Sequence, residues 1–378
     1  MTRTQRWDAI VIGAGIVGAA CARALAMDGL AVLVLESGFT GGSTTAAAMG
    51  HLVAMDDSPA QLALTALSLA LWRDLAVELP AAVEYDACGT LWIAEDDAQM
   101  EMVRLKQQTY RDAGIACEQV LGAAALSALE PNLRSGLAGA LLVPGDGVIY
   151  PPSAAVWLLA QAMARGCVVR ERCRVDEIAD QSVRCGDEWL HAHVIVNAAG
   201  GGAVALTPSL PIVPRKGHLA ITDRYPGFVR HQLVELGYLA SAHEMSSESV
   251  AFNVQPRATG QVLIGSSREL VGWDASTNRR VLREMLDRAQ RFMPALRDTS
   301  IVRTWRGFRP ATVDKLPLIG RWEPTAGVWI AAGHEGLGIT TSLGTARLIA
   351  DMVMGRTPAF DVSAFAPNRA LPAAEVAA

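Results

Sequence analysis

The sequence lacks the cysteine patterns that mark disulfide frameworks and structural metal sites. Its 378 residues include six cysteines, with no C-x-x-C pair and no zinc-type spacing. Free thiols dispersed in this way suit a reducing compartment. His191 and His193 have no third metal ligand nearby, so we expect no metal site.

An excess of positive charge is also missing. The formal net charge is −5, which leaves no electrostatic footprint for nucleic acid, and we expect no nucleic-acid partner. With 51% hydrophobic and 19% charged residues, the composition argues against a disordered chain and against a coiled coil.

Long apolar runs are absent too. No window reaches the roughly 18 uninterrupted apolar residues of a transmembrane helix, so we predict no membrane span. The basic start Met1–Arg6 and the apolar run behind it mimic a secretory signal. Against that reading, Asp8 precedes the run, and Arg23 and three glycines interrupt it. We therefore expect a cytoplasmic protein.

A strand, a helix and a second strand follow one another at the N-terminus. Residues 8–12 and 31–36 are short apolar runs typical of buried parallel strands, and 15–28 has helical spacing. The turn between the first strand and the helix is a G-x-G-x-x-G sequence, made of Gly13, Ala14, Gly15, Ile16, Val17 and Gly18. In this context the motif indicates a dinucleotide-binding β-α-β unit.

Each part of this unit has a physical role. Gly13 permits the tight turn, Gly15 lets a pyrophosphate approach the backbone, and Gly18 lets helix and strand pack closely. The amides at the helix N-terminus face the phosphates. Glu36, eighteen residues past Gly18, can accept the ribose hydroxyls and would repel a 2′-phosphate. The sequence therefore predicts FAD or NAD rather than NADP.

The segments that follow favour FAD. A NAD dehydrogenase would continue with another β-α-β unit. Here Gly41–His51 supplies backbone amides, hydroxyls and small residues suited to a pyrophosphate and a ribityl chain. Near the C-terminus, a strand at 328–332 runs into a glycine-lined loop and a helix at 338–354. The first amides of that helix could stabilise negative charge on a reduced flavin ring.

Several motifs together resemble the D-amino-acid oxidase superfamily of FAD enzymes, which includes glycine oxidase, sarcosine oxidase and D-amino-acid dehydrogenases. They occur in family order as the glycine turn, the 43–50 loop, Pro144–Pro151, Asn197–Gly200, Gly307–Pro310, Asp314–Gly320 and Ala332–Ile339. More narrowly, Ala48–Asp57 looks like the FAD-bearing β-subunit of bacterial D-hydroxyproline dehydrogenases.

The resemblance implies a set of FAD-binding residues. The set comprises Gly13, Ala14, Gly15, Ile16, Val17, Gly18, Glu36, Ser43, Thr44, Thr45, Ala48, Met49, Gly50, Val175, Ala199, Gly200, Gly333, His334, Gly336, Leu337, Gly338, Ile339 and Thr340. The cysteine that tethers FAD in sarcosine oxidases falls after the Arg-Pro motif. No cysteine lies beyond Cys185, so we expect non-covalent FAD.

The resemblance also implies that the enzyme dehydrogenates a C–N bond, with a hydride passing from the substrate carbon to flavin N5. Arg309 stands where the family's Gly-x-Arg-Pro motif places the arginine that binds the substrate carboxylate. Glycine oxidase carries a second arginine after its C-terminal Gly-His, but here Glu335 and Gly336 fill that stretch. Tyr238 or His51 would then assist carboxylate binding, and Glu335 would contact an amine or a distal hydroxyl. Arg306, three residues before Arg309, is expected on the other side of its strand in a structural role.

We predict an α/β (mixed α+β) fold of the glutathione-reductase-2 type, in which a Rossmann-like FAD-binding domain is interleaved with an antiparallel-sheet substrate domain. The FAD-binding domain would comprise 1–84, 145–212 and 305–370, the substrate domain 85–144 and 213–304, and 371–378 a frayed tail.

Three functional hypotheses remain open. The first is dehydrogenation of a D-amino or imino acid, best cis-4-hydroxy-D-proline, with an electron acceptor other than oxygen. The second is a glycine- or sarcosine-type amine oxidase that uses oxygen. The third is an FAD subunit active only in a complex with a second flavoprotein and an iron–sulfur protein, since the dispersed cysteines here could not hold a cluster.

Overall fold

The computed structural model describes residues 6–237 and 248–370, which form two large sheets. The first sheet has the strand order β17-β18-β11-β1-β2-β8. Apart from β17, which pairs antiparallel with β18, these strands run parallel. Their bounds are β1 Trp7–Ile12, β2 Val32–Leu35, β8 Val168–Arg170, β11 Glu188–Asn197, β17 Leu318–Arg321 and β18 Val328–Ala332. Off this path, β10 Ser182–Cys185 pairs antiparallel with β11, and β9 Glu177–Ala179 pairs antiparallel with β10.

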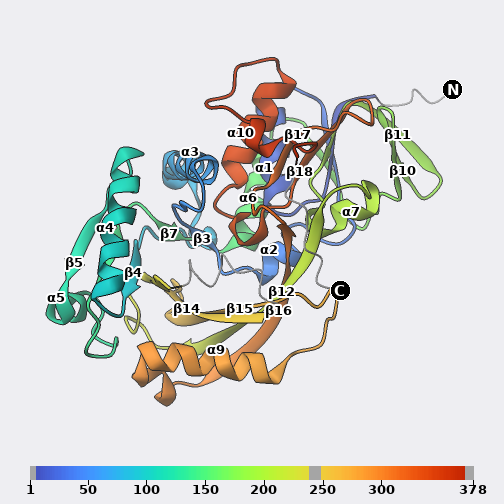
Figure 1. Cartoon of the computed structure of the whole chain (residues 1–378). Coiled ribbons are helices and arrows are strands. Elements are labelled where there is room, and N and C mark those ends of the chain that lie inside the picture. The colour runs from blue at the N-terminus through green and yellow to red at the C-terminus, as the bar shows by residue number, and fades with distance from the viewer. Residues whose placement is uncertain (1–5, 238–247, 371–378) are drawn as a thin grey trace.

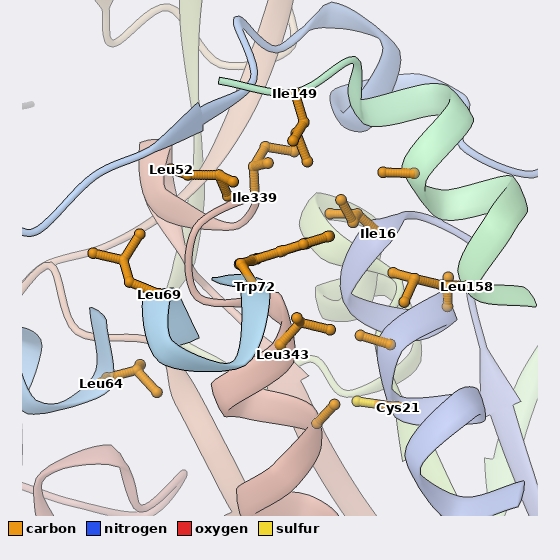
Figure 2. Packing of buried hydrophobic residues seen from close by; sticks show 14 of the residues in the cluster. Ile16, Cys21, Leu52, Leu64, Leu69, Trp72, Ile149, Leu158, Ile339 and Leu343 are labelled. Atoms are coloured by element: carbon orange, nitrogen blue, oxygen red, sulfur yellow. The ribbon is translucent and has the colours of Figure 1, made fainter. Parts of the chain in front are cut away.

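Helices pack together beside this sheet to form the largest apolar core (Figure 1). They are α1 Ile16–Met27, α3 Pro59–Leu75, α6 Pro151–Met163 and α10 Ser342–Val353. Figure 2 shows Trp72 of α3 among Ile16 of α1, Leu158 of α6 and Leu343 of α10. Trp72 is fully buried, so α3 is held mainly by packing rather than by its helix propensity.

The α3 helix and the turn after it also bear on membrane association. Pro59–Glu78 is long and apolar enough to cross a bilayer, and it is the one such stretch in the described part of the chain. However, 44% of its apolar window is buried inside the fold, where Leu64, Leu69 and Trp72 join the core. A core helix has the same composition, so this feature is weak evidence for a membrane span.

The second sheet has the order β16-β12-β15-β14-β13-β4-β6-β5. Its strands pair antiparallel except β13 with β4, which run parallel and join two segments far apart in sequence. The bounds are β4 Thr90–Ala94, β5 Glu118–Leu121, β6 Gly139–Val143, β12 Ile212–Arg224, β13 Gln232–Glu235, β14 Glu248–Pro256, β15 Gln261–Glu269 and β16 Ile301–Thr312. The mixed α/β fold predicted from the sequence is confirmed.

Helix α9, Arg279–Phe292, covers one face of the second sheet (Figure 1). Its buried residues Val281, Met285, Ala289 and Phe292 recur at helical spacing, and Asn278 caps it by accepting a hydrogen bond from the Val281 amide. Helices α4 Asp97–Asp112 and α5 Gly122–Leu129 flank β4, β5 and β6, and the short elements are α2 Ser43–Ala47, β3 His51–Leu52, β7 Gly147–Val148 and α7 Ala203–Leu206.

The last helix differs from the sequence prediction. We expected it from residue 338, but α10 begins at Ser342, after a 3-10 turn at Glu335–Leu337. Gly336 and Gly338 disfavour a regular helix in this stretch. The residues that were expected to form the first helical turn therefore lie in the loop before it.

Candidate active site

A cavity of about 660 Å³ lies between the two sheets. The parallel strands β1, β2 and β11 end at one wall, and β12, β14, β15 and β16 supply the opposite wall. The carboxyl ends of parallel strands are the usual ligand-binding edge of such a sheet, because helices there begin with free backbone amides.

The glycine turn after β1 is packed so closely that it has no room for side chains. Gly13 has a φ of +101°, and a Cβ there would lie 2.7 Å from the carbonyl oxygen of Ala198. At Gly15 a Cβ would crowd the Thr45 hydroxyl at 3.1 Å. The same hydroxyl accepts a hydrogen bond from the Ile16 amide at 3.1 Å, so Thr45 ties its loop to the start of α1.

Glu36 organises this turn from the end of β2. Its carboxylate accepts hydrogen bonds from the Ala14 amide at 2.7 Å and from the Gly38 amide at 2.6 Å. The Ser37 hydroxyl donates to the same carboxylate at 3.3 Å. A carboxylate offers about four acceptor positions, so Glu36 can still accept one ribose hydroxyl. Glu36 lines the cavity, and so does Val175.

The segment from Ser43 to His51 is tied to the second sheet as well as the first. Thr44 Oγ1 donates to the carbonyl of Phe308 on β16 at 2.8 Å. In the other direction, Nε1 of Trp305, also on β16, donates to the Ala47 carbonyl at 3.2 Å. On β14, Gln255 Nε2 donates to the Met49 carbonyl at 2.9 Å. The loop is therefore positioned by both walls of the cavity.

Most residues of the implied FAD set face this one space. Those that line it are Gly13, Gly15, Ile16, Val17, Glu36, Ser43, Thr44, Thr45, Ala48, Met49, Gly50, Val175, Ala199, Gly200, His334, Gly336, Gly338 and Ile339. The lining leaves out Ala14, Gly18, Gly333, Leu337 and Thr340. Some of these support the wall from behind, as Thr340 does by donating to the His51 carbonyl at 2.9 Å.

Arg309 and Glu335 both line the cavity. Arg309 Nη1 donates to the Ser267 carbonyl at 3.0 Å. Glu335 Oε1 lies 3.8 Å from Arg215 Nη1 and 3.6 Å from Arg268 Nε, and both of these arginines are buried. Burial alone would raise the pKa of Glu335, but the cations of Arg268, Arg309 and Arg215 lower it below its usual value. Glu335 is therefore ionised at neutral pH.

Two histidines at this end are neutral. Burial lowers the pKa of His51 to about 4 and that of His334 to about 3. His334 Nε2 lies 3.0 Å from Thr345 Oγ1, which holds the loop before α10. His51 lines the cavity, and its Nε2 has no hydrogen-bond partner among residues 6–237 and 248–370. Tyr238, the other candidate for carboxylate binding, lies outside the described residues.

Arg306 follows the expected alternation along its strand, and it also borders the cavity. It lines the same cavity as Arg309, although the two side chains leave opposite faces of the strand.

The sequence motifs gave no signal for Arg215, Arg268, Asn253 and Ser266, which the fold brings to this end of the cavity or directly behind it. Their positions depend on strand register. Arg215, for example, pairs with Arg309 across β12 and β16.

Comparison with known proteins settles the family. A sequence model of the DAO family, described as FAD dependent oxidoreductase, matches residues 8–352. The chain belongs to this family. The DAO-family chain is 28% identical to a glycine oxidase of Geobacillus kaustophilus over 97% of its own length and 98% of the relative's. The crystal structure of glycine oxidase from that organism superposes with a TM-score of 0.87 at 26% identity, covering 98% of this chain and 100% of that one.

Two further similar proteins have names that describe other activities. A hydrogen cyanide synthase subunit of Pseudomonas aeruginosa is 26% identical over 98% of both chains. An iminodiacetate oxidase from Chelativorans sp. BNC1 has a TM-score of 0.82 at 25% identity, covering 95% of this chain and 98% of that one.

The cavity of this DAO-family chain fits FAD, because its glycine turn and Glu36 stand at one end and its ionised groups at the other. When bound, FAD supplies the two-electron acceptor for C–N oxidation. The chain is an FAD-dependent oxidoreductase that acts on amino-acid C–N bonds.

Proposed function

We propose that the chain dehydrogenates a D-amino or imino acid, with cis-4-hydroxy-D-proline as substrate and an electron acceptor other than oxygen. The observation that carries the proposal is that Arg309 and an ionised Glu335 line the same cavity, close enough for the Arg309 cation to lower the pKa of Glu335. A guanidinium and a carboxylate side by side complement the carboxylate and the amine of an amino acid. The resemblance of residues 48–57 to D-hydroxyproline dehydrogenases supports the choice of substrate.

The residues divide the work between them. Arg309 binds the substrate carboxylate, and its bond to the Ser267 carbonyl limits its rotation, so the reacting carbon is held in one orientation. Glu335 attracts the amine. An ionised carboxylate stabilises the ammonium form, so Glu335 favours binding of the zwitterion, and the ammonium proton must leave before C–N oxidation.

The second candidate is a glycine- or sarcosine-type amine oxidase, which the full-length similarity to glycine oxidases favours. The third is a subunit of a larger complex with redox partners, and the relative whose name describes it as a hydrogen cyanide synthase subunit favours that idea. The described cysteines are unpaired, and no group of three metal-binding side chains was found among the described residues, so an iron–sulfur cluster would belong to the partner.

An anaerobic titration of the purified chain with cis-4-hydroxy-D-proline tests the proposal. We expect the visible flavin band to bleach, and to recolour slowly when air is admitted. Fast recolouring would assign the oxidase alternative. Bleaching by glycine or sarcosine but not by the hydroxyproline would refute the proposed substrate. Full dye-linked turnover by the isolated chain would refute the obligate complex.

A further inference from the structure

Unpartnered polar atoms gather on the wall formed by β14 and β15. Asn253 and Ser266 both line the cavity, and they are only 5% and 4% exposed. Within the described ranges 6–237 and 248–370, Asn253 Oδ1 and Ser266 Oγ have no hydrogen-bond partner. Buried polar atoms are nearly always paired, because leaving one unpaired is costly. These two atoms are therefore candidates to pair with a ligand.

The strand register places the two residues together beside Arg309. Asn253 pairs with Gly265 across β14 and β15, so Ser266 is the next residue along β15. The residue after it, Ser267, supplies the carbonyl that holds the Arg309 guanidinium.

The same wall faces the loop that carries Met49. A Cβ at Gly265 would lie 2.9 Å from Met49 Sδ, and Gln255 on β14 donates to the Met49 carbonyl. The two residues that carry the unpartnered atoms thus lie near Met49 as well as near Arg309.

We propose that Asn253 and Ser266 form a subsite for a neutral hydroxyl group on the substrate. The inference rests on the proposed function and deepens it by naming what distinguishes the substrate from unsubstituted amino acids. A substrate hydroxyl both donates and accepts hydrogen bonds. It donates to the Asn253 amide oxygen and exchanges a second bond with the Ser266 hydroxyl.

Matched substrate pairs test this subsite. The limiting rate of anaerobic flavin reduction divided by the substrate dissociation constant is measured for cis-4-hydroxy-D-proline and for D-proline, and again for D-serine and D-alanine. For the wild type we expect the hydroxylated member of a pair to be favoured roughly tenfold, as one hydrogen-bonded hydroxyl would give. Ser266→Ala and Asn253→Ala should each lower that ratio, and the double variant should bring it close to 1.

Ser182→Ala is the matched control, because Ser182 is a buried serine of β10 outside the cavity lining. It should leave the ratio as in the wild type. FAD content and melting temperature are measured for every variant to detect misfolding.

The outcomes separate the two ideas. If both members of a pair bleach the flavin and the ratio is the same in all variants, the subsite is refuted and the proposed C–N oxidation stands. If the variants lower FAD affinity without changing the ratio, the polar atoms serve the cofactor and the subsite is again refuted. If none of the four compounds bleaches the wild-type flavin, the proposed substrate class fails and the subsite fails with it.

Discussion

Glu36 offers the sharpest test of the cofactor site, through the substitution Glu36→Gln. The wild-type carboxylate accepts from two backbone amides, at 2.7 Å and 2.6 Å. Glutamine keeps one acceptor oxygen but carries no charge, so the charge-assisted hydrogen bond that Glu36 would accept from a ribose hydroxyl is lost. Such bonds contribute roughly 1.5–3 kcal/mol. Because Glu36 is half-buried, we take the lower part of this range, about 1.5–2 kcal/mol, and expect the FAD dissociation constant to rise about 10- to 30-fold.

The assay is fluorescence titration of apoprotein with FAD. Asp8→Asn is the matched control, because Asp8 Oδ2 accepts from the Ala31 amide at 2.8 Å across the same pair of strands but outside the cavity. We expect its FAD affinity to stay within about twofold of the wild type. The reasoning fails if Glu36→Gln binds FAD as tightly as the wild type, or if Asp8→Asn weakens FAD equally, because the effect would then be one of sheet stability.

Three further predictions concern catalysis and stability. Arg309→Lys keeps the charge but loses the planar fork, so kcat/KM for the reducing substrate should fall roughly 10- to 100-fold in steady-state assays, and an unchanged value would remove Arg309 from carboxylate binding. Burial raises the pKa of Asp146 to about 7. Between about pH 4 and 7 the folded chain therefore holds a proton on Asp146 that the unfolded chain has lost, and the free energy of unfolding falls as pH rises through this range. Asp146→Asn can still accept from the Ala54 amide, and in urea it should be more stable than the wild type at pH 8, on the order of 1–3 kcal/mol, with the gain vanishing near pH 4. His51 gives a pH dependence of stability with the opposite sign. Its pKa is lowered in the folded chain, so the unfolded chain binds a proton first, and the free energy of unfolding falls as pH falls from about 6.5 to 4. His51→Gln should reduce that loss, and equal acid sensitivity in both proteins would contradict the assignment.

The cofactor end could be predicted from the sequence because its physics is local. A strand, a glycine turn and a helix within a short span determine where Gly13 and Gly15 lie, and Glu36 follows at the end of the next strand. The β1–β2 register then brings Glu36 to the turn without help from distant segments.

The substrate end depends on long-range pairing, which periodicity does not reveal. Asn253 and Ser266 meet through the register of β14 with β15, and Arg215 lies opposite Arg309 through the register of β12 with β16. The parallel pairing of β13 with β4 joins the separated segments of the second sheet in the same way. No motif in those segments specifies a partner strand.

The attachment of the 43–51 loop to both sheets couples cofactor loading to the docking of one sheet on the other. Each tenfold rise in free FAD above its dissociation constant adds about 1.4 kcal/mol to the free energy of unfolding. Thr44 and Met49 are hydrogen-bonded to β16 and β14, so FAD binding also stabilises the contact of this loop with the second sheet. At low FAD concentration the cavity wall formed by β12, β14, β15 and β16 would therefore be less stable, and the free energy of unfolding of this chain depends on the FAD concentration as well as on its sequence.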